Sequence, residues 1–133
     1  MFARWPESVG GPVGEAEIVA AERALGLSFP GDYREFVRLY GGGIVGSVGI
    51  VGLRIPEFLY ATELLVTDLT RRWWGEMPET AGWLVFATDD GGPIGIELPG
   101  SRIVVLDHDF GGLIELAPDF GAYLEALLAG REP

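Results

Sequence analysis

Residues 27–42 read Leu-Ser-Phe-Pro-Gly-Asp-Tyr-Arg-Glu-Phe-Val-Arg-Leu-Tyr-Gly-Gly. This stretch predicts a helix that begins near Pro30, because proline is tolerated in the first turn of a helix. Its apolar side chains recur at i, i+3, i+4 and i+7 and share one face; they are Tyr33, Phe36, Val37 and Tyr40. Three consecutive glycines from Gly41 end the helix. An aromatic stripe at this spacing is typical of a core, so we favour a buried face over a ligand-binding cage.

Three other segments also show helical spacing of their apolar residues. In chain order they run from Glu15 to a glycine stop at Gly26, from Ile55 to Gly75, and from Pro118 to Gly130. The buried stripe of the middle helix is expected at Phe58, Ala61, Leu65 and Leu69. Residues 1–14 hold prolines and glycines in place of a helical pattern and predict an irregular lead-in.

A glycine-rich stretch precedes the middle helix and has a local period of three. Its glycines are Gly43, Gly46, Gly49 and Gly52. Collagen shares this period, but it needs long repeats that are rich in proline. Residues 44–53 therefore predict one or two strands weakened by glycine, with bulges or close backbone contacts.

After Pro78 the pattern changes to short β-strands separated by turns. The strands are expected at residues 83–88, 94–98, 102–106 and 113–116. Connections this short join antiparallel neighbours, whereas parallel strands need a long crossover. The sequence thus predicts one α+β domain over residues 1–133, in which a central antiparallel meander is accompanied by two N-terminal helices, one middle helix and one C-terminal helix.

The charged residues are strongly unbalanced, with 20 acidic and 9 basic side chains and a formal net charge of -11. All the basic residues are arginine, the one histidine is His108, and cysteine is absent. Schiff-base and P-loop lysines, thiol nucleophiles and cysteine-ligated metals are thereby excluded, as is a two-histidine metal site within one chain. Direct binding to nucleic acid is also disfavoured, because phosphates require a surplus of cationic side chains.

The chain has the length and the apolar content of a folded domain, since 48% of its 133 residues are hydrophobic. Its N-terminus shows no apolar signal core. The longest uncharged apolar stretch, Gly41–Leu53, falls short of the ~20 residues that cross a bilayer. We therefore expect a soluble cytoplasmic protein without a membrane partner, and the lack of cysteine gives no reason to place it in an oxidising compartment.

One group of residues invites a chemical interpretation. Asp107-His108-Asp109, together with Asp89, Asp90 and Glu97, offers oxygen ligands for calcium or magnesium, or a general base. The group shows neither the spacing of a calcium loop nor a Gly-x-Ser-x-Gly nucleophile elbow. Aspartate is also common in β-turns, because it tolerates unusual backbone angles. We favour turn residues here and expect no catalytic residue, metal or cofactor.

A second group, Arg71-Arg72-Trp73-Trp74, lies at the end of the expected middle helix. Tryptophan and arginine are the residue types that most often anchor protein interfaces. Alternatively, the indoles fold back over the sheet while the arginines compensate the dipole at the helix C-terminus. Both interpretations remain open, and the candidate contact residues are Arg72, Trp73 and Trp74.

The order of motifs along the chain resembles the SUKH superfamily (Smi/Knr-type). The shared pattern consists of Leu25-Gly26 at the end of the first helix, an apolar residue before Pro30, Asp32-Tyr33-x-x-Phe36, and the terminator Gly41-Gly42. Downstream the matching features are Gly52-Leu53, the turn at Phe86–Gly92, the turn at Asp107–Asp109 and a closing helix near Phe120. The likeness extends from Glu15 to Leu128.

The resemblance implies a compact α+β domain without a shared catalytic site. Most bacterial members of this family are immunity proteins that bind and neutralise a polymorphic toxin, often a nuclease, and fungal relatives regulate cell-wall synthesis through protein contacts. It thus implies a non-enzymatic protein that binds a cognate toxin domain, and the surplus of acidic side chains favours a basic one. The expected partner-binding residues are Asp89, Asp90, Glu97, Asp107, Asp109, Arg72, Trp73 and Trp74. The alternative is a regulatory interaction module with no toxin partner.

Overall fold

The computed structural model of the chain describes residues 11–45, 48–54, 65–89, 92–98, 100–107 and 112–129. Within these residues lie the α-helices α1 (Glu15–Leu25), α2 (Gly31–Tyr40), α3 (Val66–Glu76) and α4 (Phe120–Leu128), and a short 3-10 helix, η4 (Pro78–Thr80). The strands are β1 (Gly43–Val45), β2 (Val48–Ile50), β3 (Trp83–Asp89), β4 (Gly92–Glu97), β5 (Ile103–Asp107) and β6 (Gly112–Ala117).

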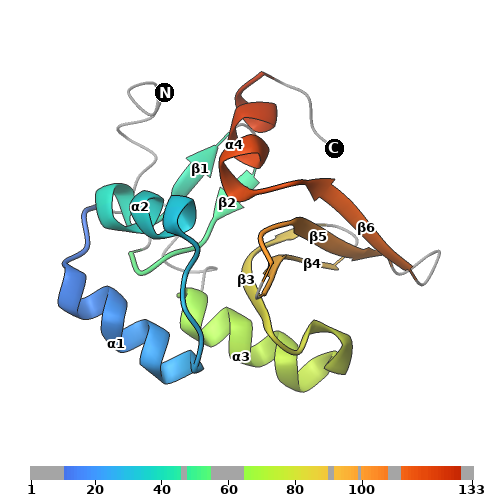
Figure 1. Cartoon of the computed structure of the whole chain (residues 1–133), viewed down its shortest axis with the longest axis horizontal. Coiled ribbons are helices and arrows are strands. Elements are labelled where there is room, and N and C mark those ends of the chain that lie inside the picture. The colour runs from blue at the N-terminus through green and yellow to red at the C-terminus, as the bar shows by residue number, and fades with distance from the viewer. Residues whose placement is uncertain are drawn as a thin grey trace.

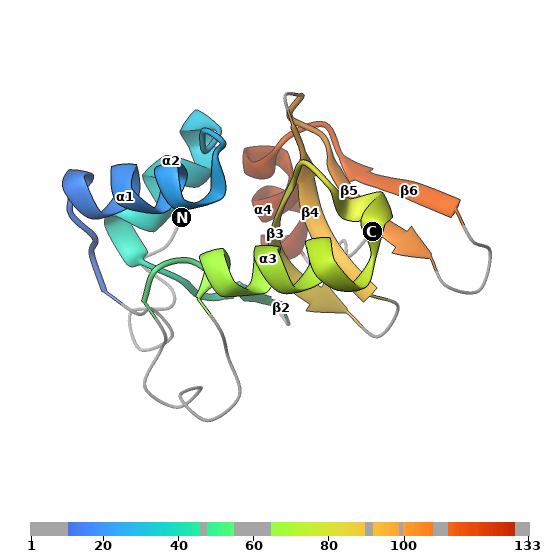
Figure 2. The same cartoon turned by 90° about the horizontal axis from the view of Figure 1, so that it is seen from below.

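The described strands form two antiparallel sheets. β1 and β2 make a small hairpin, and the larger sheet has the order β3-β4-β5-β6, in which each strand pairs with the next in the chain. Helices α1 and α2 lie to the left of this larger sheet in Figure 1, with α3 along the bottom and α4 at the top. Figure 2 gives the same division from below, with α3 nearest the viewer. The predicted α+β architecture with an antiparallel meander is confirmed.

Glycine ends the first two helices at the predicted places. Gly26 follows α1 with φ 71° and Gly41 follows α2 with φ 76°, a left-handed conformation that glycine adopts without steric cost. Of the predicted lead-in, residues 11–14 are described and form neither helix nor strand, whereas residues 1–10 lie outside the described part. It packs on the end of α2, where the backbone N–H groups of Gly11 and Val13 donate to carbonyl oxygens of that helix.

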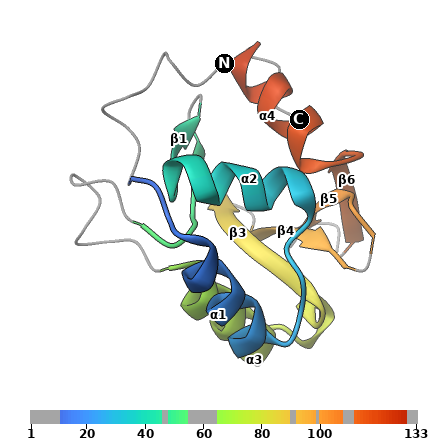
Figure 3. The same cartoon turned by 60° about the vertical axis from the view of Figure 1, so that its left-hand side comes forward.

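The core is built around the aromatic face of α2, as predicted. Tyr33 and Phe36 are buried, and Tyr40 packs half-buried against them. Phe120 at the start of α4 contacts Tyr33 edge to face, with ring centroids 5.1 Å apart, and Phe86 on β3 in the same way at 5.3 Å. These rings join α2, the sheet and α4. Figure 3 shows α2 crossing the molecule between α4 above and α1 with α3 below.

The middle helix differs from its prediction at both ends. Leu65 precedes α3 with an extended backbone (φ -70°, ψ 158°), so the expected stripe is wrong at that position, and Phe58 and Ala61 lie outside the described residues. The helix begins at Val66, whose backbone N–H donates to the carbonyl of Gly52 over 2.8 Å. Its buried side chains are Val66, Leu69 and Thr70, and it ends at Glu76, one residue beyond Gly75.

The glycine-rich stretch forms the hairpin β1–β2, in which Gly43 pairs with Ile50. The predicted close backbone contact is present just after it. A Cβ built on Gly52 would lie 2.0 Å from the carbonyl oxygen of Gly41. That oxygen accepts the backbone N–H groups of Leu53 and Arg54, at 2.7 and 3.0 Å. Glycine at position 52 thus lets two segments of backbone touch.

Outward-facing backbone groups of β3 form hydrogen bonds with residues that lie outside the larger sheet. The buried hydroxyl of Thr70 on α3 donates to the carbonyl of Val85 and accepts its N–H, at 3.2 and 3.0 Å. The indole N–H of Trp74 donates to the carbonyl of Trp83 over 3.0 Å. Val51, next to β2, donates its N–H to Phe86 over 2.7 Å. The carbonyl oxygens of Trp83, Val85 and Phe86 and the N–H of Val85 therefore have partners on this side of the sheet.

Replacing Thr70 by valine is expected to lower the free energy of unfolding by about 1–3 kcal/mol, because the buried N–H and C=O of Val85 lose their partner. Valine keeps the shape of threonine, so packing changes little. Urea denaturation of Thr70→Val measures the loss. The control is Thr67→Val on the same helix, expected within about 0.5 kcal/mol of wild type; equal effects of the two changes would contradict the role given to the Thr70 hydroxyl.

Candidate partner-binding surface

Two of the predicted acidic residues lie in one row at one end of the sheet. Ala87, Ile94 and Val105 pair across three neighbouring strands. Because β3 and β5 run in the same direction, Asp89 and Asp107, each two residues further on, end their strands side by side, two strand spacings or about 10 Å apart. Asp90 and Asp109, like His108, lie outside the described residues. The topology thus brings the ends of two acid-bearing strands together.

Glu97 lies at the opposite end of the sheet, which the sequence did not reveal. It pairs with Trp83 at the start of β3 and lies five positions after Gly92 along β4, a run of about 17 Å. Its carboxylate accepts a hydrogen bond from Arg102 over 2.6 Å. This bond holds the pKa of Glu97 below its ordinary value. Glu97 is therefore engaged within its own chain and is not part of the row formed by Asp89 and Asp107.

The residues Arg72, Trp73 and Trp74 also lie near that opposite end, on α3. Arg72 is exposed and forms an ion pair with Glu76 at 3.4 Å. Both indoles are half-buried and pack against the core, as the folding-back interpretation predicts. The Trp73 Nε1 atom is buried without an acceptor among the described residues. Trp74 lies beside Trp83, at the far end of β3 from Asp89.

A groove of about 620 Å³ opens next to Trp74. It lies between residues 25–30, which connect α1 to α2, and the end of the sheet at Leu98 and Gly100. Its wall is mostly apolar, with Phe29 and Leu27 among the lining side chains. Sequence reasoning missed this groove, because its walls come from segments far apart in the chain and share no spacing or motif.

The acidic surplus is concentrated in the sheet half of the chain. Between residues 73 and 130 the sequence has ten acidic side chains and one arginine, Arg102, whereas the rest has ten acidic side chains and eight arginines. Arg102 is shared between Glu97 and Glu115, the latter at 3.5 Å. Residues 73–130, which include the larger sheet and α4, therefore carry -9 of the formal net charge of -11.

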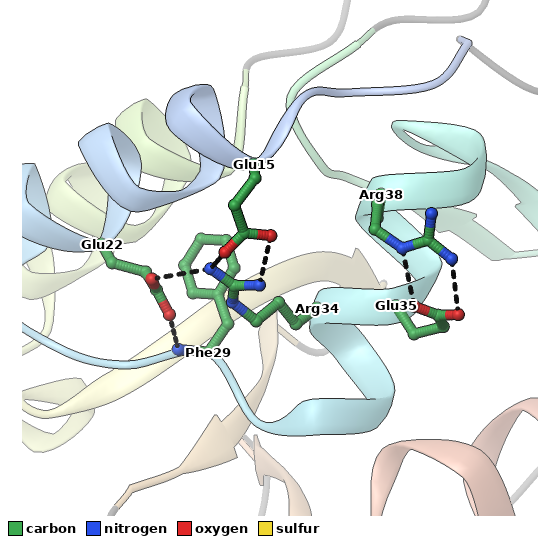
Figure 4. Close-up of polar contacts among 6 residues, drawn as sticks. All are labelled: Glu15, Glu22, Phe29, Arg34, Glu35 and Arg38. Atoms are coloured by element: carbon green, nitrogen blue, oxygen red, sulfur yellow. Dashed lines mark hydrogen bonds and ion pairs between the residues drawn. The ribbon is translucent and has the colours of Figure 1, made fainter.

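Three arginines of the helical half, Arg34, Arg38 and Arg54, are held by acids of that same half. Arg34 on α2 binds both oxygens of Glu15 on α1 and reaches Glu22 at 3.6 Å (Figure 4). Glu22 in turn accepts the backbone N–H of Phe29 over 2.8 Å. On α2, Arg38 binds Glu35 through two hydrogen bonds of 2.8 Å (Figure 4). These contacts tie α1, α2 and their connection together.

Arg34→Gln is expected to make stability less dependent on pH in acid. The hydrogen bond from Arg34 holds the pKa of Glu15 below its ordinary value of 4.5, so this stabilisation is present above that value and is lost as the pH falls through the lower folded-state pKa. The gap in unfolding free energy between wild type and variant should thus narrow as the pH falls below 4.5, as urea denaturation at several pH values will measure.

The control for this experiment is Arg23→Gln, because Arg23 forms no ion pair among the described residues. The free energy of unfolding of Arg23→Gln should stay close to that of wild type across the pH range. If the difference in unfolding free energy between wild type and Arg34→Gln stays constant with pH, the role assigned to the Glu15 contact is contradicted.

Among the described residues, no group of three or more histidine, cysteine or acidic side chains is arranged to hold a metal ion. In the same part of the chain, no helix has both the length and the apolar character needed to span a bilayer.

Comparison with known proteins gives one finding. Residues 12–126 match the family model described as SMI1 / KNR4 family (SUKH-1). The match begins in the lead-in and reaches into α4, so it includes the aromatic helix α2 and the whole sheet. No curated protein matches the chain.

Proposed function

The chain belongs to the SMI1/KNR4 family (SUKH-1), and from this premise we propose that it is a non-enzymatic immunity protein that binds and neutralises a cognate bacterial toxin domain. The observation that carries the proposal is the concentration of acidic residues in the sheet half, with Asp89 and Asp107 at the ends of β3 and β5, two strands that run in the same direction on either side of β4. Binding would block the toxin's substrate site, and no catalytic step is required of this chain.

The charge distribution favours a basic partner such as a nuclease domain. Active faces that bind nucleic acid carry cationic side chains, because these neutralise phosphates. An acidic inhibitor is steered onto such a face and associates at up to ~10⁸–10⁹ M⁻¹s⁻¹ at low salt. Fast capture suits a protein that must act before the toxin reaches its substrate. The acidic contacts proposed for this face are Asp89, Asp90, Asp107 and Asp109.

The other proposed contacts, Arg72, Trp73, Trp74 and Glu97, lie toward the opposite end of β3. β3 has seven residues, so about 20 Å separates its ends. An interface of standard size covers about 800 Å² on each partner, a patch about 28 Å across. One partner can therefore contact the acidic row and the exposed parts of the tryptophans together, with steering at one end and apolar anchoring at the other.

The test uses the protein encoded beside this gene, carrying a mutation that abolishes its toxicity. We expect a stoichiometric complex whose association rate falls steeply as salt increases. Asp89→Asn with Asp107→Asn should slow association about two- to tenfold at low salt. The charge-matched control is Glu79→Gln with Glu125→Gln, two exposed residues outside the row. Lack of binding contradicts the proposed function, and an association rate indifferent to salt contradicts its electrostatic part.

A second candidate is a regulatory interaction module without a toxin partner. It is favoured by the apolar groove beside Trp74, which is of the size that accepts an apolar side chain or a short segment of another protein. The neighbouring gene separates the two candidates, since a toxin gene beside this one favours immunity and its absence favours regulation.

A further inference from the structure

The two edge strands of the larger sheet, β3 and β6, differ in whether their outward-facing backbone groups are hydrogen-bonded. The outer edge of β3 is satisfied by Thr70, Trp74 and Val51, as described above. β6 is the other edge strand and pairs with β5. Among the described residues, no hydrogen bond joins the outer edge of β6 to another part of the chain. Toward the described part of the chain, a row of backbone donors and acceptors on β6 is therefore unpaired, and such a row is a template for another strand.

The first half of β6 is also apolar and exposed. Leu113 and Ile114 keep 41% and 42% of their surface accessible, and they are the two most exposed large apolar side chains in the described part of the chain. Neighbours along a strand point to opposite faces, so each face of the strand carries one of them. They pair with Leu106 and Val105 of β5, which are half-buried. Figure 2 shows β6 on the side of the sheet away from α1 and α2.

This half of the edge lacks the features that normally protect one. Exposed edges are usually blunted by charged residues, proline or a bulge. Between Gly112 and Ile114 the strand has none of the three. The charged residue Glu115 and the irregularity in pairing, between Ile103 and Val104 on β5, belong to its second half. An unprotected apolar edge of this kind marks a surface that another molecule covers.

We propose that the outer edge of β6 is a docking site for an extended, cationic segment of the partner protein, which pairs with β6 and lengthens the sheet. The backbone supplies hydrogen bonds, while Leu113 and Ile114 supply apolar contacts on both faces. This inference rests on the proposed function for the identity of the partner, but the surface itself can be tested without that partner.

Charge determines the chemistry of the occupant. β6 lies in the half of the chain that has ten acidic side chains and one arginine. Asp107 ends β5 opposite Gly112, and Glu115 is exposed on β6 itself. A strand with arginine or lysine beside its apolar residues is attracted to this edge. A second copy of this chain is disfavoured, because pairing of two β6 edges would bring together two molecules with a net charge of -11 each.

The experiment uses a defined probe, a capped heptapeptide of alternating valine and arginine, and the whole protein observed by NMR. At millimolar peptide we expect shifts in β6 and at least about tenfold slower exchange of its outward-facing amides. A heptapeptide of alternating valine and glutamate should produce neither effect. Leu113→Ser with Ile114→Ser should weaken binding by about tenfold, while Leu39→Ser on α2, where the side chain is 40% exposed, should leave it unchanged.

The proposal is overturned if the basic peptide protects amides elsewhere, if it does not bind, or if both peptides protect β6 equally. It is also overturned if β6 becomes protected as the protein concentration alone is raised, because the occupant is then a second copy. Failure of the neighbouring gene product to bind contradicts the proposed function and leaves the peptide result standing. Conversely, a toxin complex that leaves β6 exposed contradicts this inference alone.

Discussion

Phe120→Ala is expected to lower the free energy of unfolding by about 3–5 kcal/mol. Phe120 is 1% exposed and its ring contacts Tyr33, Phe36 and Phe86, each within 5.5 Å between centroids. Its removal leaves a cavity where α2, β3 and α4 meet, and it also removes three aromatic contacts, each worth about 0.5–1.5 kcal/mol beyond burial. Urea denaturation followed by circular dichroism measures the loss.

Leu39→Ala is the matched control, because Leu39 lies on α2 with 40% of its surface exposed. Its free energy of unfolding is expected to lie within about 0.5 kcal/mol of that of wild type. A loss below about 1 kcal/mol for Phe120→Ala would show that the aromatic cluster is not the centre of the core.

Gly52→Ala is expected to lower the free energy of unfolding by about 2–4 kcal/mol, although it adds a single methyl group. The new Cβ would lie 2.0 Å from the backbone oxygen of Gly41, so one of the two backbone segments must move. Movement breaks the bonds that this oxygen accepts from Leu53 and Arg54 and disturbs the bond from Val66 to Gly52 that starts α3. Thermal and urea denaturation measure the combined loss.

The control is Gly49→Ala, in the same glycine-rich stretch, where an added Cβ meets no atom within 4 Å. Alanine at this position should leave stability unchanged or raise it by a few tenths of a kcal/mol, since it restricts the unfolded chain. Similar losses for the two variants would mean that flexibility of the stretch, and not the contact at Gly52, requires glycine.

The first two helices were predictable because glycine marks the end of each. Gly26 and Gly41 adopt the left-handed conformation that ends a helix, and the spacing of the aromatic residues placed α2 on the core. The start of α3 was not predictable in the same way. The apolar spacing continues smoothly through Leu65, but the backbone turns there because Val66 bonds to Gly52. A contact between distant segments decides that boundary, and local spacing carries no sign of it.

For the candidate surface, the sequence located the acidic strand ends but grouped Glu97 with them wrongly in space. Glu97 is close to Asp89 along the chain, yet β4 runs away from that end of the sheet and carries Glu97 to the start of β3. The open edge of β6 was hidden for another reason. The pair Leu113-Ile114 places an apolar side chain on each face of the strand, which would be typical of a buried strand. Only its place at the edge of the sheet leaves it exposed.

The packing of Trp74 against Trp83 gives the molecule an optical probe of its own. Trp73, Trp74 and Trp83 gather at the end of β3 that borders the groove, far from the open edge of β6. After replacement of Trp5, which lies outside the described residues, all indole fluorescence comes from that one place. A partner that covers the tryptophans changes the emission colour, and one that sits on β6 alone leaves it unchanged. Emission spectra recorded during a titration therefore show whether a partner covers the tryptophans or binds at the β6 edge alone, and the protein needs no added label.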